Sequence, residues 1–155
     1  MENRAEDRLI KILTGAHLTL APDFEALSDR MVELDLGCGK GSFTTALAKK
    51  YPERTVLAAD VMINRLRKLV KRNQREGIDN MLALRVEAAT LVCLMLPDNA
   101  IDRLHILCPD PWPKSRHRYH RLICSNICAH FRRILRKDGV LHFATDDRPY
   151  FESSL

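Results

Sequence analysis

The sequence predicts one α/β domain built around a parallel sheet. Segments with the apolar pattern of strands alternate with segments of helical periodicity, and glycine or proline separates many of them. An acidic residue also stands at or just past the end of every predicted strand. The chain of 155 residues has the length of a single domain. Right-handed crossovers between parallel strands would place helices on both faces of the sheet.

The first part of the chain is expected to lead into this domain. Residues 5–13 carry aliphatic side chains among charged ones and predict a short helix, and a connecting segment then extends to residue 30. We therefore expect an N-terminal helix and connecting segment over residues 1–30 and the main domain over residues 31–155.

Strands and helices alternate through the rest of the chain. The predicted strands, which are short apolar runs, cover residues 31–36, 55–60, 81–86, 101–107 and 140–145. The predicted helices, which show a period near 3.6, cover residues 42–50, 62–75, 89–95 and 122–135. The inner faces of the two longest early helices would carry Phe43, Ala46 and Leu47, and Leu66, Leu69 and Val70.

The acids that follow the strands predict where a ligand binds. They are Asp35, Asp60, Glu87, Asp110 and Asp146. In open parallel sheets, ligands bind outside the carboxyl ends of the strands, near the point where the strand order reverses. We therefore expect these acids to lie around one site.

A glycine-rich turn follows the first predicted strand. Its pattern is Gly37-x-Gly39-x-Gly41, and glycine lets the backbone approach a ligand closely because it has no Cβ atom. A dinucleotide-binding fingerprint would carry its third glycine at position 42, where this chain has Ser42. This difference, together with the lack of a second domain, argues against the alternative of a nicotinamide-dependent oxidoreductase.

A proline-rich loop and a run of cations follow the fourth predicted strand. Residues 108–121 contain three prolines, Asp110, Trp112 and several basic side chains. Between Trp112 and Lys137 there are eight Lys or Arg and no acid, and the whole chain has a formal net charge of +5. Such clustering favours an anionic partner, with nucleic acid considered first. The simpler alternative is a connector that leads into a solvated basic helix.

Two motifs carry a resemblance to known enzymes. The spacing Asp35-x-Gly37-x-Gly39-x-Gly41 resembles the first motif of the S-adenosylmethionine-dependent methyltransferases. Residues 109–117, Pro-Asp-Pro-Trp-Pro-Lys-Ser-Arg-His, closely resemble the signature of the tRNA (guanine-N7)-methyltransferases, the bacterial TrmB family.

The resemblance implies a fold, a cofactor and a reaction. The fold would be the Rossmann-like one of class I methyltransferases, with strand order 3-2-1-4-5 and helices on both faces. S-adenosyl-L-methionine would be the cofactor, and the methyl group would pass to N7 of a guanosine in the variable loop of tRNA. Because guanine N7 has a lone pair and no proton, this transfer needs no general base at the nucleophile.

The resemblance also assigns roles to individual residues. The cofactor would contact Asp35, Gly37, Cys38, Gly39, Gly41, Asp60, Glu87, Ala88 and Asp110. The RNA substrate would contact Lys114, Arg116, His117, Arg118, Arg121 and Asp146. Asp110 would also be catalytic, because a fixed carboxylate stabilises the positive charge that develops on the purine.

The chain departs from the family pattern at several places. It has Asp35 and Asp60 where the family usually has Glu, and Tyr119 and His120 where Lys and Arg are common. The family's C-terminal motif is absent because the chain stops at residue 155. We therefore expect a C-terminally truncated member that lacks the last strand pair, has an exposed fifth strand open to association, and transfers methyl groups poorly or not at all.

Several alternatives stay open from the sequence alone. The chain could be a non-catalytic RNA-binding module, a methyltransferase that acts on adenine N6, or one with another nucleic-acid acceptor. Trp112 could stack on a base or pack under the loop. The basic face of residues 65–75 could be a solvated helix surface or, less in keeping with the pattern, a second RNA site.

The remaining sequence features concern the compartment and metals. No segment resembles a signal peptide or reaches transmembrane length, so no membrane association is expected. The five cysteines, an odd number at irregular spacing, suit a reducing, cytoplasmic environment. His120, Cys124 and Cys128 have a helical spacing that zinc ligands could share, but cysteine also packs well on an apolar helix face, and we expect no metal. The oligomeric state stays open.

Overall fold

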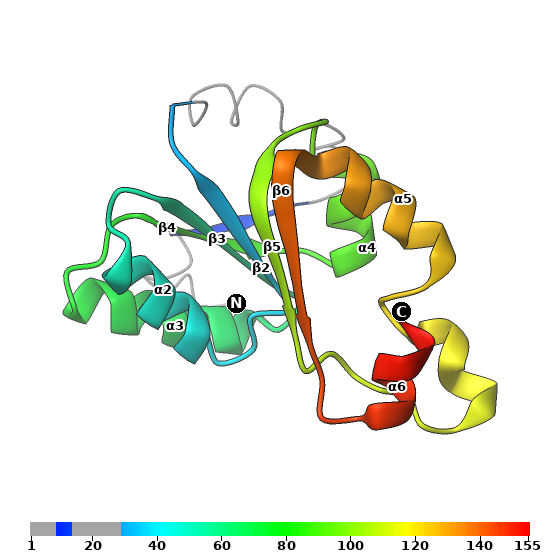
Figure 1. Ribbon diagram of the computed structural model, residues 1–155. Helices are drawn as coiled ribbons and strands as arrows, with labels where there is room; N and C mark the ends of the chain where they lie inside the picture. Colours follow the sequence, from blue (N-terminus) through cyan, green and yellow to red (C-terminus); the bar gives the residue numbers. More distant parts are fainter. Residues whose placement is uncertain (1–8, 14–28) are drawn as a thin grey trace.

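A computed structural model describes residues 9–13 and 29–155 of the chain. Its centre is a sheet of six parallel strands in the order β1-β4-β3-β2-β5-β6 (Figure 1). The strands are β1 (Ile10–Ile12), β2 (Val32–Leu36), β3 (Thr55–Asp60), β4 (Met81–Arg85), β5 (Ile101–Leu107) and β6 (Leu135–Ala144). The predicted α/β class with a parallel sheet is therefore confirmed.

Helices lie on both faces of the sheet (Figure 1). They are α2 (Ser42–Lys50), α3 (Ile63–Arg75), α4 (Ala88–Thr90), the π-helical turn η2 (Leu91–Met95), the 3₁₀ helix η3 (Ser115–His120), α5 (Ser125–Ile134) and α6 (Arg148–Ser153). On one face, Leu66, Leu69 and Val70 of α3 pack on alanines of β3 and β4, as the helical stripe predicted. On the other face, η2 and α5 cover the larger apolar core.

The expected strand order needs one correction. The five predicted strands are β2 to β6 in Figure 1, and they lie in the order β4-β3-β2-β5-β6. Numbered from the first predicted strand, this is the expected order 3-2-1-4-5. A sixth strand, however, extends the sheet beyond β4. This strand, β1, lies where a helix over residues 5–13 was predicted. Ile10 of β1 is buried opposite Ala83, and its β-branched side chain suits an extended backbone. Residues 5–8 of the predicted helix lie outside the described residues.

Helix α2 shows which side chains the sequence pattern misjudged. Its buried residues are Thr44, Thr45 and Ala48, whereas Ala46 of the predicted inner face is exposed. The two threonines can be buried because each hydroxyl has a hydrogen-bond acceptor on a neighbouring element. Thr44 donates to Asp35 of β2, and Thr45 donates to Asn73 Oδ1 of α3 over 2.8 Å. A periodicity based on apolar residues alone cannot detect such a polar interface.

The last predicted helix is shorter at both ends. It was expected over residues 122–135, but α5 begins at Ser125 because the backbone N–H of Ile123 donates to the Tyr150 hydroxyl instead of following a helical path. At the other end, Leu135 already pairs with Ile101 as part of β6. An irregularity in the β5–β6 register follows, where Asp138 adopts a φ of 66°. Within the described residues, β6 pairs only with β5 and forms an edge of the sheet.

Candidate active site

A cavity of about 650 Å³ lies at the carboxyl ends of the central strands. The ends of β2, β3 and β5 form its floor, and the proline-rich loop, η3 and the first turns of α5 form a wall. This is the place that the strand-end acids predicted, since strand order reverses between β2 and β5. Of the predicted site residues, those that line the cavity are Gly37, Asp60, Glu87, Ala88, Asp110 and Arg121.

The glycine-rich turn has a different role at each glycine. All three have positive φ angles, and the N–H groups of Gly37 and Cys38 both donate to Ala59 O over 2.9 Å. Gly37 lines the cavity, and a Cβ atom there would project into open space. Gly41 instead packs on α3, where a Cβ atom would come within 2.4 Å of Leu69 Cδ1. Cys38, Gly39 and Gly41 therefore shape the turn without lining the cavity, and burial raises the pKa of the Cys38 thiol.

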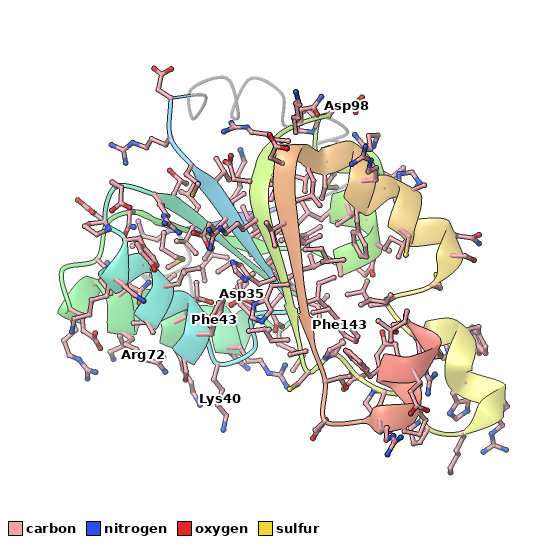
Figure 2. All side chains as sticks on the ribbon, viewed as in Figure 1. Asp35, Lys40, Phe43, Arg72, Asp98 and Phe143 are labelled. Carbon is pink, nitrogen blue, oxygen red and sulfur yellow. The ribbon has the colours of Figure 1, made fainter. Side chains whose placement is uncertain are left out.

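Asp60 connects the glycine turn to the start of α3. One carboxylate oxygen accepts from Gly39 N over 2.9 Å, and the other accepts from Met62 N over 2.7 Å. Arg65 Nη1 lies 3.5 Å from the same carboxylate. Each carboxylate oxygen has two lone pairs, so these contacts leave acceptor capacity toward the cavity. Lys40, in the same turn, points outward and away from the sheet (Figure 2).

Asp35 lies beneath the cavity instead of in its wall. Its side chain is 3% exposed and accepts a hydrogen bond from the Thr44 hydroxyl, and Figure 2 shows it in the interior of the molecule. Burial raises the pKa of the Asp35 carboxyl, and the hydrogen bond from Thr44 offsets only part of this effect. Asp35 does not line the cavity, and its contact with a cofactor stays a prediction.

Glu87 lines the cavity, and its carboxylate forms hydrogen bonds with the first backbone N–H groups of α4. Its carboxylate caps α4 by accepting from Ala89 N over 2.9 Å and from Thr90 N over 2.7 Å. Burial disfavours ionisation of Glu87, but these hydrogen bonds outweigh burial and lower its pKa. The side chain is thus held as a fixed anion beside Ala88.

Asp110 stands in the proline-rich loop at the cavity with an uncommitted carboxylate. It is exposed, and it makes no hydrogen bond or ion pair with any residue that the structure describes. The loop around it is strongly bent, because Cys108 and Trp112 adopt φ angles of 48° and 42°. The N–H of Cys108 donates to Ala144 O over 2.7 Å and fixes the beginning of the loop against β6.

The predicted RNA contacts fall into two groups. Lys114 and Arg116 are exposed, and His117 packs its ring edge-on to Trp112, with centroids 5.9 Å apart. Lys114, Arg116 and His117 do not line the cavity, although Trp112 does. Asp146, which is exposed after β6, also lies outside the cavity lining. For Arg118, only its position in η3 is described.

Arg121 differs from the other predicted RNA contacts because it is buried. It is 9% exposed, and its Nε donates to Pro111 O over 2.7 Å while Nη1 donates to Ser153 Oγ over 3.0 Å. The guanidinium therefore holds the proline-rich loop to α6, and these two segments lie side by side in Figure 1. The sequence pattern could not separate this arginine from its exposed neighbours.

Further cavity residues were not predicted. Arg65 lines the cavity from the first turn of α3, and Asn126 and His130 line it from α5. The latter two are four residues apart, and this spacing on a helix that follows the proline-rich loop was a usable signal. Tyr119 and His120 also line the cavity.

Two negative findings apply to the described residues. Among residues 9–13 and 29–155, no three or more His, Cys, Asp or Glu side chains form a group that could hold a metal ion. In the same ranges, none of the helices has the length and apolarity needed to cross a membrane.

The sheet order, the glycine turn and the cavity together define a class I methyltransferase fold. The structure is similar to the 16S rRNA methyltransferase KamB, with a TM-score of 0.57 and 24% identity over 76% of this chain and 54% of that one. It is also similar to coclaurine N-methyltransferase, crystallised with N-methylheliamine and SAH, with a TM-score of 0.56 and 20% identity over 78% of this chain and 33% of that one. At these identities, the similarity concerns the fold alone.

The chain belongs to the family described as "Putative methyltransferase", whose pattern matches residues 15–155. A tRNA (guanine-N(7)-)-methyltransferase of Lactobacillus delbrueckii is 35% identical over 135 residues, which are 86% of this chain and 62% of that protein. One of Lactococcus lactis is 34% identical over 128 residues, which are 83% of this chain and 58% of that protein. The resemblance stated from the two motifs is thus confirmed. The chain spans about three fifths of the length of these curated relatives.

Proposed function

We propose that this chain binds S-adenosylmethionine in the cavity and transfers its methyl group to N7 of a guanosine in tRNA. The main support is the position of Asp110, an uncommitted carboxylate in the wall of a cavity at the switch point of a methyltransferase sheet. The names of the 34–35% identical relatives support the same reaction and the same acceptor.

The residues around the cavity fit this cofactor. Its ribose hydroxyls need acceptors, and Asp60 keeps acceptor capacity toward the cavity after holding the glycine turn. Gly37 leaves open space where any other residue would place a side chain. We propose that the fixed Glu87 carboxylate and Ala88 border the adenine end. S-adenosylmethionine supplies the methyl group on a positively charged sulfonium.

The role proposed for Asp110 follows from the chemistry of the acceptor. Guanine N7 offers an in-plane lone pair and carries no proton, so the enzyme must align the base and stabilise the positive charge that moves onto it. A carboxylate that forms no ion pair within the described residues keeps its charge available for this stabilisation. Asp146 would accept from the N1–H and N2–H₂ groups of guanine, which adenine lacks in this arrangement.

The RNA itself would be held mainly through its phosphates. Lys114 and Arg116 are exposed beside the cavity wall and can neutralise phosphate without reading the base. Because N7 lies in the deep, narrow major groove of A-form RNA, the target base must come from a loop or leave its stack. We propose Arg118 as a further phosphate contact on the basis of its position in η3.

The test is to incubate the chain with labelled S-adenosylmethionine and unmodified tRNA, and then to digest the tRNA and separate its nucleosides. We expect 7-methylguanosine, formed at the low rate that the sequence predicts, and a kcat at least ~10²-fold lower for Asp110→Ala with measurable cofactor binding. Label in N6-methyladenosine would instead identify an adenine methyltransferase. Cofactor binding without any label in tRNA would identify a non-catalytic RNA-binding member of the fold.

A further inference from the structure

Three aromatic rings contact one another in a row beside the cavity, each tilted relative to the next. The rings of Tyr119 and His120 have centroids 3.9 Å apart with an interplanar angle of 40°. The rings of His120 and Trp112 have centroids 4.9 Å apart at 41°. All three residues line the cavity, and we call them the aromatic platform.

The outer ring of this platform has no structural partner beyond its neighbour. Tyr119 is 77% exposed, and its hydroxyl makes no hydrogen bond with any residue that the structure describes. Tyr150 provides a contrast within the same chain, because it is fully buried and its hydroxyl accepts from Ile123 N over 2.9 Å. A single exposed tyrosine is ordinary on a protein surface. Its place at the end of a row of contacting rings in a cavity wall is what indicates a ligand.

The platform is held at the cavity by the segment around it. Arg121, the residue after His120, is fixed to Pro111 O and to Ser153 Oγ, and the N–H of His117 donates to Lys114 O over 2.8 Å. The segment that carries the rings is therefore fixed to the rest of the chain at Arg121 and folded locally by the turn from Lys114 to His117, so a ligand that stacks on Tyr119 would meet a surface that is already formed.

The surroundings indicate the chemical class of that ligand. Lys114 and Arg116 are exposed in the same segment, and no acid occurs between Trp112 and Lys137. A flat aromatic face beside unneutralised cations suits a molecule that combines planar rings with phosphates. Proteins that bind single-stranded RNA combine stacking aromatic rings with a basic surface in this way.

We propose that the aromatic platform stacks on an unpaired nucleobase of the RNA substrate, with Tyr119 making the contact. This inference rests on the proposed function for the identity of the substrate, but its geometry is independent of Asp110 and of methyl transfer. The base would lie beside the cavity and help to hold the RNA strand displaced from its helix. Tyr119 would thus determine affinity for unpaired RNA and would be a positioning residue for the reaction.

The chain carries its own probe for this contact, since Trp112 is its one tryptophan. We would titrate the chain with unmodified tRNA, with a short single-stranded RNA and with a fully paired duplex of the same sequence, and follow Trp112 fluorescence. The expected result is quenching by tRNA and by the single strand, and little by the duplex. Equal quenching by the single strand and the duplex would overturn the proposal.

Substitutions of Tyr119 separate stacking from other effects. Tyr119→Ala should weaken binding of the single strand about 5- to 150-fold, the range that corresponds to loss of one stacked base. Tyr119→Phe should bind as the original chain does, and Tyr119→Leu, which keeps apolar bulk without the ring electrons, should resemble Ala. The dependence of affinity on salt should stay unchanged in all three variants, because stacking releases no counterions.

The outcomes distinguish this proposal from the proposed function. If the chain does not methylate tRNA but Tyr119→Ala still weakens single-strand binding, the platform stands and the proposed function fails. If tRNA is methylated and Tyr119→Ala binds RNA normally, the platform proposal fails alone. A variant that loses affinity for S-adenosylmethionine but not for RNA would assign the rings to the cofactor and would also overturn the proposal.

Discussion

The guanidinium carbon of Arg121 lies 4.7 Å from the centre of the Tyr150 ring, and this contact joins the cavity wall to α6. Both residues are buried, and each has a second connection. Arg121 donates to Pro111 O, and Tyr150 accepts from Ile123 N. Neighbouring positions in a basic run can therefore have opposite roles, since one cation is part of the interior while others face solvent.

Replacing Arg121 should affect stability more than RNA binding. Arg121→Met keeps the apolar stem but leaves Pro111 O and Ser153 Oγ without their donor, so we expect the free energy of unfolding to fall by about 1–3 kcal/mol in urea titrations. Arg116→Met, at an exposed position of the same segment, is the matched control and should stay within about 0.5 kcal/mol. If Arg121→Met unfolds like the original chain and its RNA binding depends less on salt, Arg121 contacts RNA phosphate, as predicted from the sequence.

The exposed cations of the loop should determine how RNA affinity depends on salt. Replacing Lys114 and Arg116 with Ala should weaken binding of unrelated RNA sequences to a similar extent. The salt slope should fall by about 0.7–0.9 for each phosphate that the variant no longer neutralises. Filter binding between low and moderate salt measures this slope.

Helix α3 offers a control for the loop cations. Lys68 and Lys71 are exposed and form no ion pair with any described residue, and Arg72 on the same helix points outward (Figure 2). If the basic face of α3 is a solvated surface, Lys68→Ala combined with Lys71→Ala should leave the salt slope unchanged. A decrease in slope as large as that of the loop variants would show a second RNA-binding surface there.

Replacing Asp60 should weaken both cofactor binding and the fold, because its carboxylate lines the cavity and also holds the glycine-rich turn. Asp60→Asn retains one acceptor oxygen where Gly39 N and Met62 N now use two, so one of these partly buried N–H groups loses its partner. We expect at least a ~10-fold loss of affinity for S-adenosylmethionine by calorimetry and a loss of about 1–3 kcal/mol in stability. Glu53→Gln removes an acid that is exposed and outside the cavity, and it should change neither quantity. Unaltered cofactor affinity in Asp60→Asn would remove Asp60 from the site.

Periodicity and turn residues were sufficient to predict most of the sheet. The strand β1 was missed because a run of three residues is too short to separate a strand from a helix by its pattern, and only pairing with β4 decides its conformation. The burial of Thr44 and Thr45 was missed for a related reason. Their partners, Asp35 and Asn73, come from other elements, and the sequence does not show which polar groups will meet.

The candidate site was predicted in its location but less well in its members. Parallel topology brings strand-end acids to one edge, so Asp60, Glu87 and Asp110 line one cavity. Topology does not show which carboxylates are already used within the protein. Glu87 caps a helix, and Asp35 is buried below the cavity, because local hydrogen bonds decide those outcomes.

Two carboxylates on β2 should give the chain opposite responses to pH. Glu33 and Asp35 are both buried, but Glu33 contacts His105 Nε2 at 2.7 Å and also pairs with Arg54, whereas Asp35, among the residues that the structure describes, accepts only from Thr44. Burial disfavours ionisation of Glu33, but the hydrogen bonds from its two partners outweigh burial and lower its pKa. Burial raises the pKa of Asp35, and no cation within the described residues forms an ion pair that would offset this effect.

The direction in which pH changes the stability of the fold follows, for each carboxylate, from the linkage between protonation and folding. Glu33 stabilises the fold above its ordinary pKa of 4.5, and this contribution is lost as pH falls through its lower folded value. Asp35 stabilises the fold below its ordinary pKa of 3.8, and that contribution is lost as pH rises through its higher folded value. At neutral pH, therefore, the charge on Glu33 supports the folded chain, whereas the charge on Asp35 opposes it.

Thermal and urea unfolding between pH 3 and pH 8 should separate the two carboxylates. Glu33→Gln should lower the free energy of unfolding at pH 7 by about 3–5 kcal/mol, because Arg54 and His105 lose their charged partner, and the deficit should shrink only as pH falls below 4.5. Asp35→Asn keeps an acceptor for Thr44 and removes the buried charge, so it should raise stability at pH 7, with a gain that declines toward pH 4. If Asp35→Asn destabilises the chain at pH 7 and the deficit disappears in acid, the ionised carboxylate has a favourable partner, and the account of Asp35 as a buried, unpaired acid below the cavity is wrong.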